Sequence, residues 1–232
     1  MFRLKTLVSK LLHYYGYEIY KIDPDRAFCS LDHIELLEDK DFKASVEEVR
    51  KHTLLDLFRL ANLWQLCRRT PEEGALIEIG TYKGGGALHL SNCCPNRKIY
   101  ICDSFQGFEK IDTKLDGLFK HDMFRNTSEI RVDLLFKNKT RNYEICAGFF
   151  PSSCMEKKMV PISFAHVDVD VYKATKETLD YLAPLMLPHS MIVIDDYLRN
   201  ADGVVQATHE FLAKHPNWRI FPLFPGQGLL LS

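Results

Sequence analysis

The spacing of apolar residues changes from helical before residue 70 to alternating strand and helix patterns after residue 75. Apolar runs with β-type spacing predict five strands, at 75–80, 98–103, 142–148, 162–170 and 191–196. Helical spacing follows three of these runs, at 85–91, 173–182 and 204–214. The final NWRIFPL, PGQG and LLLS predict a terminal hairpin. Strands that alternate with helices indicate an α/β fold with a mostly parallel sheet covered on both faces.

The N-terminal segment has a different pattern. MFRLKTLVSKLL places its apolar side chains on one helical face, with Arg3, Lys5 and Lys10 around it. Such a helix packs on the domain or on a second subunit, or it lies on a membrane surface as a basic amphipathic helix. Residues 21–44 are polar and mixed, which predicts a loop. We therefore expect an N-terminal helix and linker over 1–45 and one α/β domain over 46–232.

Two segments of the domain outside the predicted strands have patterns of their own. Ser45-Val-Glu-Glu48 has the form of a capping box, which predicts a helix that starts there and ends near Arg69, before Pro71. Residues 106–141 are charged and only weakly periodic. A stretch of that length inside a compact domain is typical of a lid or an inserted helix over a site, so we expect a lid insertion over about 106–141.

Composition excludes several classes of protein. The chain has 232 residues, 46% of them hydrophobic, and a net charge of −1, so no basic surface for nucleic acid is predicted. Its seven cysteines form no C-x-x-C motif, which favours reduced thiols and a cytoplasmic location. No apolar run reaches the roughly 18 residues of a membrane span, and the N-terminus lacks the apolar core of a signal peptide.

The first strand leads into a glycine-rich turn, EIGTYKGGGA, which starts at Glu78. Its spacing is neither G-x-G-x-x-G nor that of a P-loop, so a dinucleotide or nucleotide triphosphate site is not indicated. Glu78 would repel a pyrophosphate but favour an ammonium group. The second strand ends in Asp103, where a carboxylate can accept hydrogen bonds from both hydroxyls of a ribose. An amino group together with a ribose suggests S-adenosylmethionine, although the turn alone is also compatible with a simple tight connection.

Carboxylates follow the fourth and fifth predicted strands. Asp168 ends one and Asp195 and Asp196 end the other; if these strands are neighbours, their ends lie about 5 Å apart. Three carboxylates that converge repel one another, and a hard divalent cation such as Mg²⁺, Mn²⁺ or Ca²⁺ would relieve this. The alternative is that these aspartates cap helices or pair with lysines. Asp170 and His166 share strand parity with Asp168, so either is a candidate base, although such a histidine is more often a core residue.

These residues belong to a set of ordered motifs. From about Thr53 onward the chain resembles the macrocin O-methyltransferase family of S-adenosylmethionine-dependent sugar methyltransferases. The matching segments are EIGTYKGGGA (78–87), DSFQGF (103–108), GFFPSS (148–153), HVDVDVYKAT (166–175), VIDDY (193–197) and GVVQATHEFL (203–212). The sequence departs from the family at LPHSM (187–191), where a Gly-Gly turn is usual, and in the lid.

The resemblance implies a Rossmann-like class I methyltransferase fold, with a seven-stranded sheet whose last strand is antiparallel. It implies a divalent metal, usually Mg²⁺, at Asp168, Asp195 and Asp196. It also implies a set of contacts to S-adenosylmethionine, with Phe105 or Phe149 over the adenine. The expected cofactor-binding residues are Glu78, Gly80, Thr81, Gly84, Asp103, Ser104 and Phe105.

The function that follows is O-methylation of a hydroxyl on a sugar or glycosylated small molecule. We expect Asp168 to be both metal ligand and proton acceptor, with Asp170, His166 or His121 of the lid as alternatives. Three other interpretations remain: a D-x-D glycosyltransferase, a haloacid-dehalogenase-type phosphatase, and a non-catalytic methyltransferase-like subunit. The expected partners are the small-molecule or glycan acceptor and, through the N-terminal helix, a second copy of the chain in a homodimer or larger oligomer, or a membrane surface.

Overall fold

The computed structural model describes residues 35–137, 142–197 and 201–232. The chain divides into two units, Met1–Glu35 and Leu36–Ser232. The predicted N-terminal helix, with its oligomer and membrane alternatives, lies outside the described residues.

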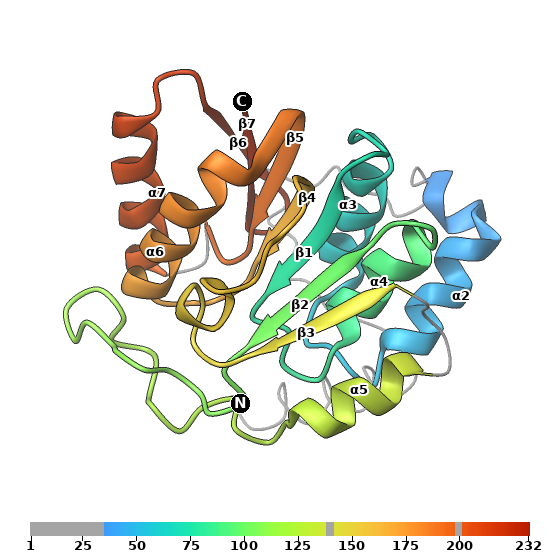
Figure 1. Ribbon diagram of the computed structural model, residues 1–232, viewed down its shortest axis with the longest axis horizontal. Coiled ribbons are helices and arrows are strands. Elements are labelled where there is room, and N and C mark those ends of the chain that lie inside the picture. Colours follow the sequence, from blue (N-terminus) through green and yellow to red (C-terminus); the bar gives the residue numbers. More distant parts are fainter. Residues whose placement is uncertain (1–34, 138–141, 198–200) are drawn as a thin grey trace, which may run out of the picture. The chain divides into compact units, whose positions relative to one another are not determined.

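Seven strands form one sheet in the order β3-β2-β1-β4-β5-β7-β6 (Figure 1). β7 runs antiparallel to β5 and β6, and the other neighbours are parallel, which confirms the predicted class I methyltransferase topology. β4 and β5 are neighbours, as the carboxylate argument required. β5 begins earlier than predicted and includes the LPHSM segment. The strands are β1 (Ala75–Ile79), β2 (Ile99–Asp103), β3 (Tyr143–Ala147), β4 (Ile162–Val167), β5 (Met186–Ile194), β6 (Arg219–Leu223) and β7 (Gln227–Leu231).

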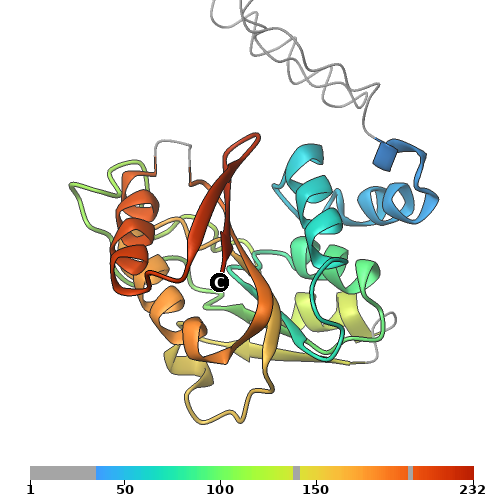
Figure 2. The ribbon, with the colours of Figure 1, turned by 90° about the horizontal axis from the view of Figure 1, so that it is seen from above.

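Helices cover both faces of the sheet (Figure 2). One face carries α2 (Lys40–Val49), α3 (Leu57–Cys67), α4 (Gly85–Cys93) and α5 (Glu129–Lys137). The other carries α6 (Tyr172–Leu182) and α7 (Asp202–Lys214). Short 3-10 turns lie at η2 (Glu35–Glu38), η3 (Ser152–Cys154) and η4 (Ala183–Leu185).

The strands divide their side chains between two apolar cores because successive residues of a strand point to opposite faces. In β1, Ile77 and Ile79 join the cluster that contains Leu179 of α6. Leu76, the residue before Ile77, points to the opposite face and joins the cluster that contains Leu63 of α3. Both faces of the central strands are therefore largely apolar, and Glu78, Asp103 and His166 lie at or near the carboxyl ends of β1, β2 and β4.

The predicted capping box is wrong. α2 begins at Lys40, where Asp39 Oδ1 accepts from the backbone nitrogens of Asp41 and Phe42, at 2.9 and 3.1 Å. Asp56 caps a second helix, α3, by accepting from the backbone of Arg59 at 3.0 Å. Ser45 is buried in the middle of α2. Aspartate at each N-cap satisfies the free N–H groups, so the serine is left for a tertiary contact.

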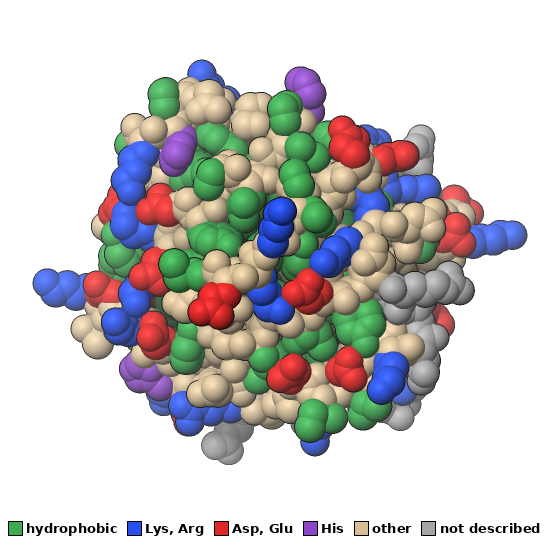
Figure 3. Space-filling model, viewed as in Figure 1, with side chains coloured by type: hydrophobic (Ala, Val, Ile, Leu, Met, Phe, Trp, Pro, Cys, Tyr) green, Lys and Arg blue, Asp and Glu red, His purple; other side chains and the backbone are tan. Residues whose placement is uncertain are grey.

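The predicted lid region, 106–141, contains α5 and, before it, a strap of turns over residues 106–124. The face of the molecule in Figure 3 carries acidic and basic side chains interspersed with apolar ones. Among the described residues, no helix combines the length and the apolar character that crossing a membrane requires.

Candidate active site

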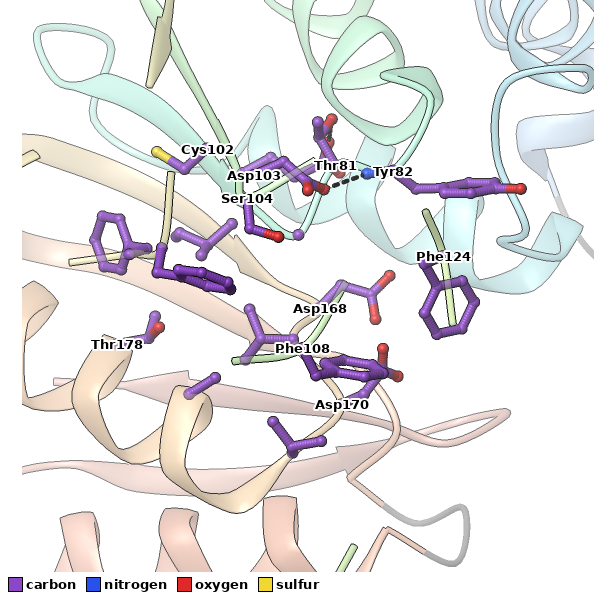
Figure 4. A pocket seen from close by; sticks show the side chains of 18 of the residues that line it. Thr81, Tyr82, Cys102, Asp103, Ser104, Phe108, Phe124, Asp168, Asp170 and Thr178 are labelled. Carbon is purple, nitrogen blue, oxygen red and sulfur yellow. Dashed lines mark hydrogen bonds between the residues drawn. The ribbon is translucent and has the colours of Figure 1, made fainter. Parts of the chain in front are cut away.

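A cavity of about 220 Å³ opens at the carboxyl ends of β1, β2 and β4. This is the edge at which parallel α/β sheets bind ligands. In Figure 4, Asp103 and Ser104 lie on one side, and Asp168 and Asp170 lie on the other beside the rings of the strap. The predicted residues that line the cavity are Glu78, Gly80, Thr81, Asp103, Ser104, Asp168, Asp170 and Asp196. The cavity lining does not include the remaining predicted residues, which are Gly84, Phe105, His166 and Asp195.

The two predicted glycines of the turn permit close packing. Gly80 has φ +87°, and a Cβ there would lie 1.8 Å from the backbone oxygen of Asp168. Glycine at this position lets the end of β1 approach the end of β4. Gly84 has φ +86° and faces Val132 and Leu135 of α5, which would lie 3.2 and 3.3 Å from a Cβ at this position. The second glycine therefore serves helix packing and lies away from the cavity.

Glu78 is buried and engaged on both carboxylate oxygens. Oε2 accepts from the hydroxyl of Thr81, and Oε1 lies 2.9 Å from Nδ1 of His166. Glu78 and His166 are register partners on β1 and β4, so the pairing follows from the sheet itself. The His166 ring is fully buried, which argues against the predicted role as the base for a bound acceptor.

Asp103 is fixed by the backbone around it. Its Oδ2 accepts from the nitrogen of Tyr82 and its Oδ1 from that of Phe105, both at 2.7 Å. Desolvation raises the pKa of the Asp103 carboxyl, which remains beside the cavity with lone pairs to spare. Phe105, at φ +55°, turns away and packs against the core shared by α3 and α4. Phe149, the other aromatic residue proposed for the adenine, lines the cavity instead.

Four carboxylates meet at the ends of β4 and β5. Asp168, Asp170 and Asp196 each offer an oxygen within 4.8 Å of the others, and Asp168, Asp195 and His166 form a second such group. Burial, followed by the charge of Asp195, raises the pKa of Asp168 well above its ordinary value. Burial, followed by the charge of Asp196, does the same for Asp170. Asp170 and Asp196 also have positive φ, 61° and 57°, a conformation that costs energy and often marks functional sites.

Arg59 was not predicted as a site residue. Its side chain is buried, reaches from α3, and donates through Nη1 to Asp195 and through Nη2 to Asp196, the latter at 2.8 Å. The ion pairs with both aspartates raise the pKa of Arg59 against the effect of its burial. One sequence signal existed: Arg59 lies one turn before Leu63, on the apolar face of its helix. An arginine in that position needs a buried partner.

The strap places aromatic rings over the acidic end of the cavity. Phe124 lies between Tyr82 and Phe108, with ring centroids 5.9 and 5.8 Å away, and both contacts are edge-on. All three residues line the cavity. His121, the alternative base from the lid, is exposed outside the lining, and its Nδ1 lies 3.0 Å from the backbone oxygen of Phe108. Two residues of the predicted lid segment, Phe108 and Phe124, thus line the cavity.

Comparison with known families decides the identity of the fold and chemistry. The family model of macrocin-O-methyltransferase (TylF) matches residues 42–217. The chain belongs to this family. It is therefore a methyltransferase, and the glycine turn, Asp103 and the acidic cluster all lie within the matched segment.

Curated relatives support this assignment. Mycinamicin III 3''-O-methyltransferase of Micromonospora griseorubida is 24% identical over 200 residues, which cover 74% of this chain and 78% of the relative. An 8-demethyl-8-(2,3-dimethoxy-alpha-L-rhamnosyl)-tetracenomycin-C 4'-O-methyltransferase of Streptomyces olivaceus is 23% identical over 184 residues, covering 71% and 69%. Among solved structures, the O-methyltransferase NovP matches with a TM-score of 0.68 at 22% identity, covering 78% of this chain and 81% of that one.

The donor set of this methyltransferase fits a hard divalent cation. Arg59 supplies one positive charge against four carboxylates, and neither Asp168 nor Asp170 has a salt-bridge partner among the residues that the structure describes. Oδ1 of Asp195 is also buried without a hydrogen-bond donor. Oxygen ligands from carboxylates are those that Mg²⁺ and Mn²⁺ prefer. A cation at this cluster would offset charge that the protein leaves uncompensated.

Proposed function

We propose that this enzyme transfers the methyl group of S-adenosylmethionine to a hydroxyl of a sugar or glycosylated small molecule, with the help of a divalent cation. One observation carries the proposal: a single cavity is lined by Asp103 and the glycine turn as well as by Asp168, Asp170 and Asp196. A carboxylate that can bind the ribose hydroxyls and an oxygen-rich cation site thus open into the same space.

The donor half would use Asp103 and the β1 turn. Asp103 is held by two backbone N–H groups, so its remaining lone pairs can accept from both ribose hydroxyls without reorganisation. Glu78 adds negative charge beside the turn, which favours the ammonium group of the methionine part. Because Thr81 and His166 hold its oxygens, Glu78 also fixes the turn against β4.

The acceptor half would use the acidic cluster. Asp168, Asp195 and Asp196 would hold the cation, which when bound would orient the acceptor oxygens and lower the pKa of the reacting hydroxyl. Asp168 and Asp170 both line the cavity, and either can take the hydroxyl proton as the methyl group is transferred. Arg59 reaches from α3 and holds Asp195 and Asp196 in place.

A sugar acceptor is supported by aromatic rings from the strap and from the turn after β1. Tyr82, Phe108 and Phe124 offer ring faces and edges at the acidic end of the cavity, and such surfaces suit the apolar C–H faces of a hexose. The names of the curated relatives place their reactions on glycosylated natural products. A glycosyltransferase would need a nucleotide diphosphate beside Glu78, where its charge is repelled.

Transfer of a labelled methyl group tests the proposal. The purified enzyme would be incubated with methyl-labelled S-adenosylmethionine, Mg²⁺ and a panel of rhamnosides and other hexosides, with each acceptor hydroxyl removed in turn. We expect label in one glycoside class, lost with one deoxy analogue and with Asp170→Asn, and retained with Asp122→Asn, a change at an exposed acid outside the cavity. Label on phenols or carboxylates that carry no sugar, with none on any glycoside, would refute the sugar assignment.

A further inference from the structure

Away from the cavity, two helix ends bring three cysteine sulfurs together. Cys67 ends α3, Cys93 ends α4 and Cys94 is the C-cap of α4. Their Sγ atoms all lie within 4.8 Å of one another, and those of Cys67 and Cys94 are 3.5 Å apart. None of the three lines the cavity. We refer to Cys67, Cys93 and Cys94 as the thiol triad.

The spacing of the thiol triad fits a common central ion. Zinc binds thiolate sulfur at about 2.3 Å, and two sulfurs at tetrahedral positions around it are then about 3.8 Å apart. The Cys67–Cys94 separation of 3.5 Å is close to that value, and the other two sulfur pairs lie within 4.8 Å. Small side-chain rotations would bring all three sulfurs to one ion without moving either helix.

The thiol triad can also be reached from solvent. Cys67 is fully buried, whereas Cys93 and Cys94 are only partly buried. An ion can therefore enter from the side of α4 and keep a fourth position for water. Three protein ligands with an open fourth position is an established zinc arrangement.

A fixed arginine provides the matching charge. Nη1 of Arg97 lies 4.0 Å from Sγ of Cys94, and the guanidinium is held by the backbone oxygen of Gly74 at 2.9 Å and by Thr70 Oγ1 at 3.0 Å. Three thiolates around a divalent ion carry one net negative charge, which Arg97 would balance.

A second group of cysteines provides a contrast within the same chain. Cys102, Cys146 and Cys154 also have sulfurs within 4.8 Å of one another, with 3.9 Å between Cys102 and Cys154. All three are fully buried and belong to the apolar core against α6 and α7. Packing explains this group, because an ion would have to cross the core to reach it.

We propose that the thiol triad binds one thiophilic divalent cation, Zn²⁺, through three thiolates. Each thiol gives its proton to solvent as the ion binds, so three protons are released. The ion would join the end of α3 to the end of α4. Because α3 carries Arg59 and α4 starts at the glycine turn, this link would hold two walls of the active site together from behind.

Cadmium titration of the full chain tests the proposal, because Cd²⁺ resembles Zn²⁺ in its ligands and gives an ultraviolet charge-transfer band only with thiolates. The aspartate cluster is silent in this band, and excess Mg²⁺ keeps it occupied. A Cys29→Ser background removes the cysteine that lies outside the described residues. We expect one equivalent of Cd²⁺ to saturate the band, added Zn²⁺ to displace it, and Zn²⁺ to raise the melting temperature.

Single variants locate the site. Cys94→Ser, or Cys93→Ser if the first fails to fold, should lose the band at one equivalent and the Zn²⁺-dependent melting shift, while it retains binding of S-adenosylhomocysteine. The matched control Cys146→Ser, in the buried group, should keep both signals. A wild-type chain without the band, a band unchanged in both triad variants, or a band lost only in Cys146→Ser would overturn the proposal.

Discussion

The Nδ1 atom of His166 lies 2.9 Å from Oε1 of Glu78, and both side chains are buried. A carboxylate can only accept, so Nδ1 carries the proton and points at Glu78. The pair ties β4 to β1 directly below the cavity. His166 therefore acts on the reaction through the position of Glu78 and the glycine turn.

This role predicts different outcomes for two amide substitutions of His166. Asn can place its N–H near the position of Nδ1, whereas Gln reaches toward Nε2 and leaves Oε1 of Glu78 without its donor. We expect His166→Gln to lower the free energy of unfolding by about 1–3 kcal/mol and weaken cofactor binding, and His166→Asn to do less of both. Chemical denaturation and calorimetry with S-adenosylhomocysteine measure these effects. If His166 were the base, both variants would instead lose the same limb of the pH–rate profile.

Removal of the Arg59 charge gives a second prediction. Without it, the buried Asp195 and the partly buried Asp196 have no cationic partner from α3. Arg59→Gln should lower the stability of the metal-free protein by about 3–5 kcal/mol. The rise in melting temperature on addition of Mg²⁺ or Mn²⁺ should be larger than in the wild type, because the ion then replaces the missing charge.

Arg59→Lys is the matched control for that experiment, since it keeps the charge but loses the two-pronged geometry. It should fall between the wild type and Arg59→Gln in both measurements. A metal-induced shift that is smaller in Arg59→Gln than in the wild type would mean that Arg59 assembles the metal site and does not compete with the ion for charge.

His89 predicts a pH dependence of stability. Its Nε2 donates to the backbone oxygen of Leu60 at 3.0 Å, so Nδ1 accepts from the Ser45 hydroxyl at 2.8 Å. Burial lowers the pKa of His89 to about 4 from 6.5. Between these values the unfolded chain binds a proton that the folded chain does not. The stabilisation is thus complete above pH 6.5 and is lost as the pH falls towards 4.

The loss across that window amounts to about 3 kcal/mol, at 1.36 kcal/mol for each pKa unit. Urea unfolding of the wild type and of His89→Gln above and inside the window measures it. The wild type should lose more stability than the variant as the pH falls, because the variant has no group to titrate there. Parallel losses in the two proteins would contradict the assigned protonation of His89.

The sequence predicts the sheet well because its central strands are apolar on both faces and because carboxylates end β2 and follow β4 and β5. Asp103, Asp168 and Asp196 could be placed at one edge from strand ends alone. Arg59 could not, because its partners lie more than 130 residues away and no local pattern encodes the pairing. Phe105 packs against the apolar core and not into the cavity because its backbone has a positive φ, which the motif does not reveal. Ser45 and Glu48 have the spacing of a capping box, but Asp39 and Asp56 cap the two helices, which that spacing does not reveal.

In the proposed enzyme, the donor site and the cation site are separate halves of one cavity. Calorimetry of S-adenosylhomocysteine and of Mn²⁺ with Asp103→Asn, Asp196→Asn and the exposed control Asp122→Asn can tell the two halves apart. Asp103→Asn should weaken binding of S-adenosylhomocysteine at least about tenfold and leave Mn²⁺ binding intact, since it loses one charge-assisted hydrogen-bond acceptor. Asp196→Asn should do the reverse, and Asp122→Asn should change neither. Equal loss of both ligands in Asp103→Asn and Asp196→Asn, or no Mn²⁺ binding to the wild type, would contradict the account.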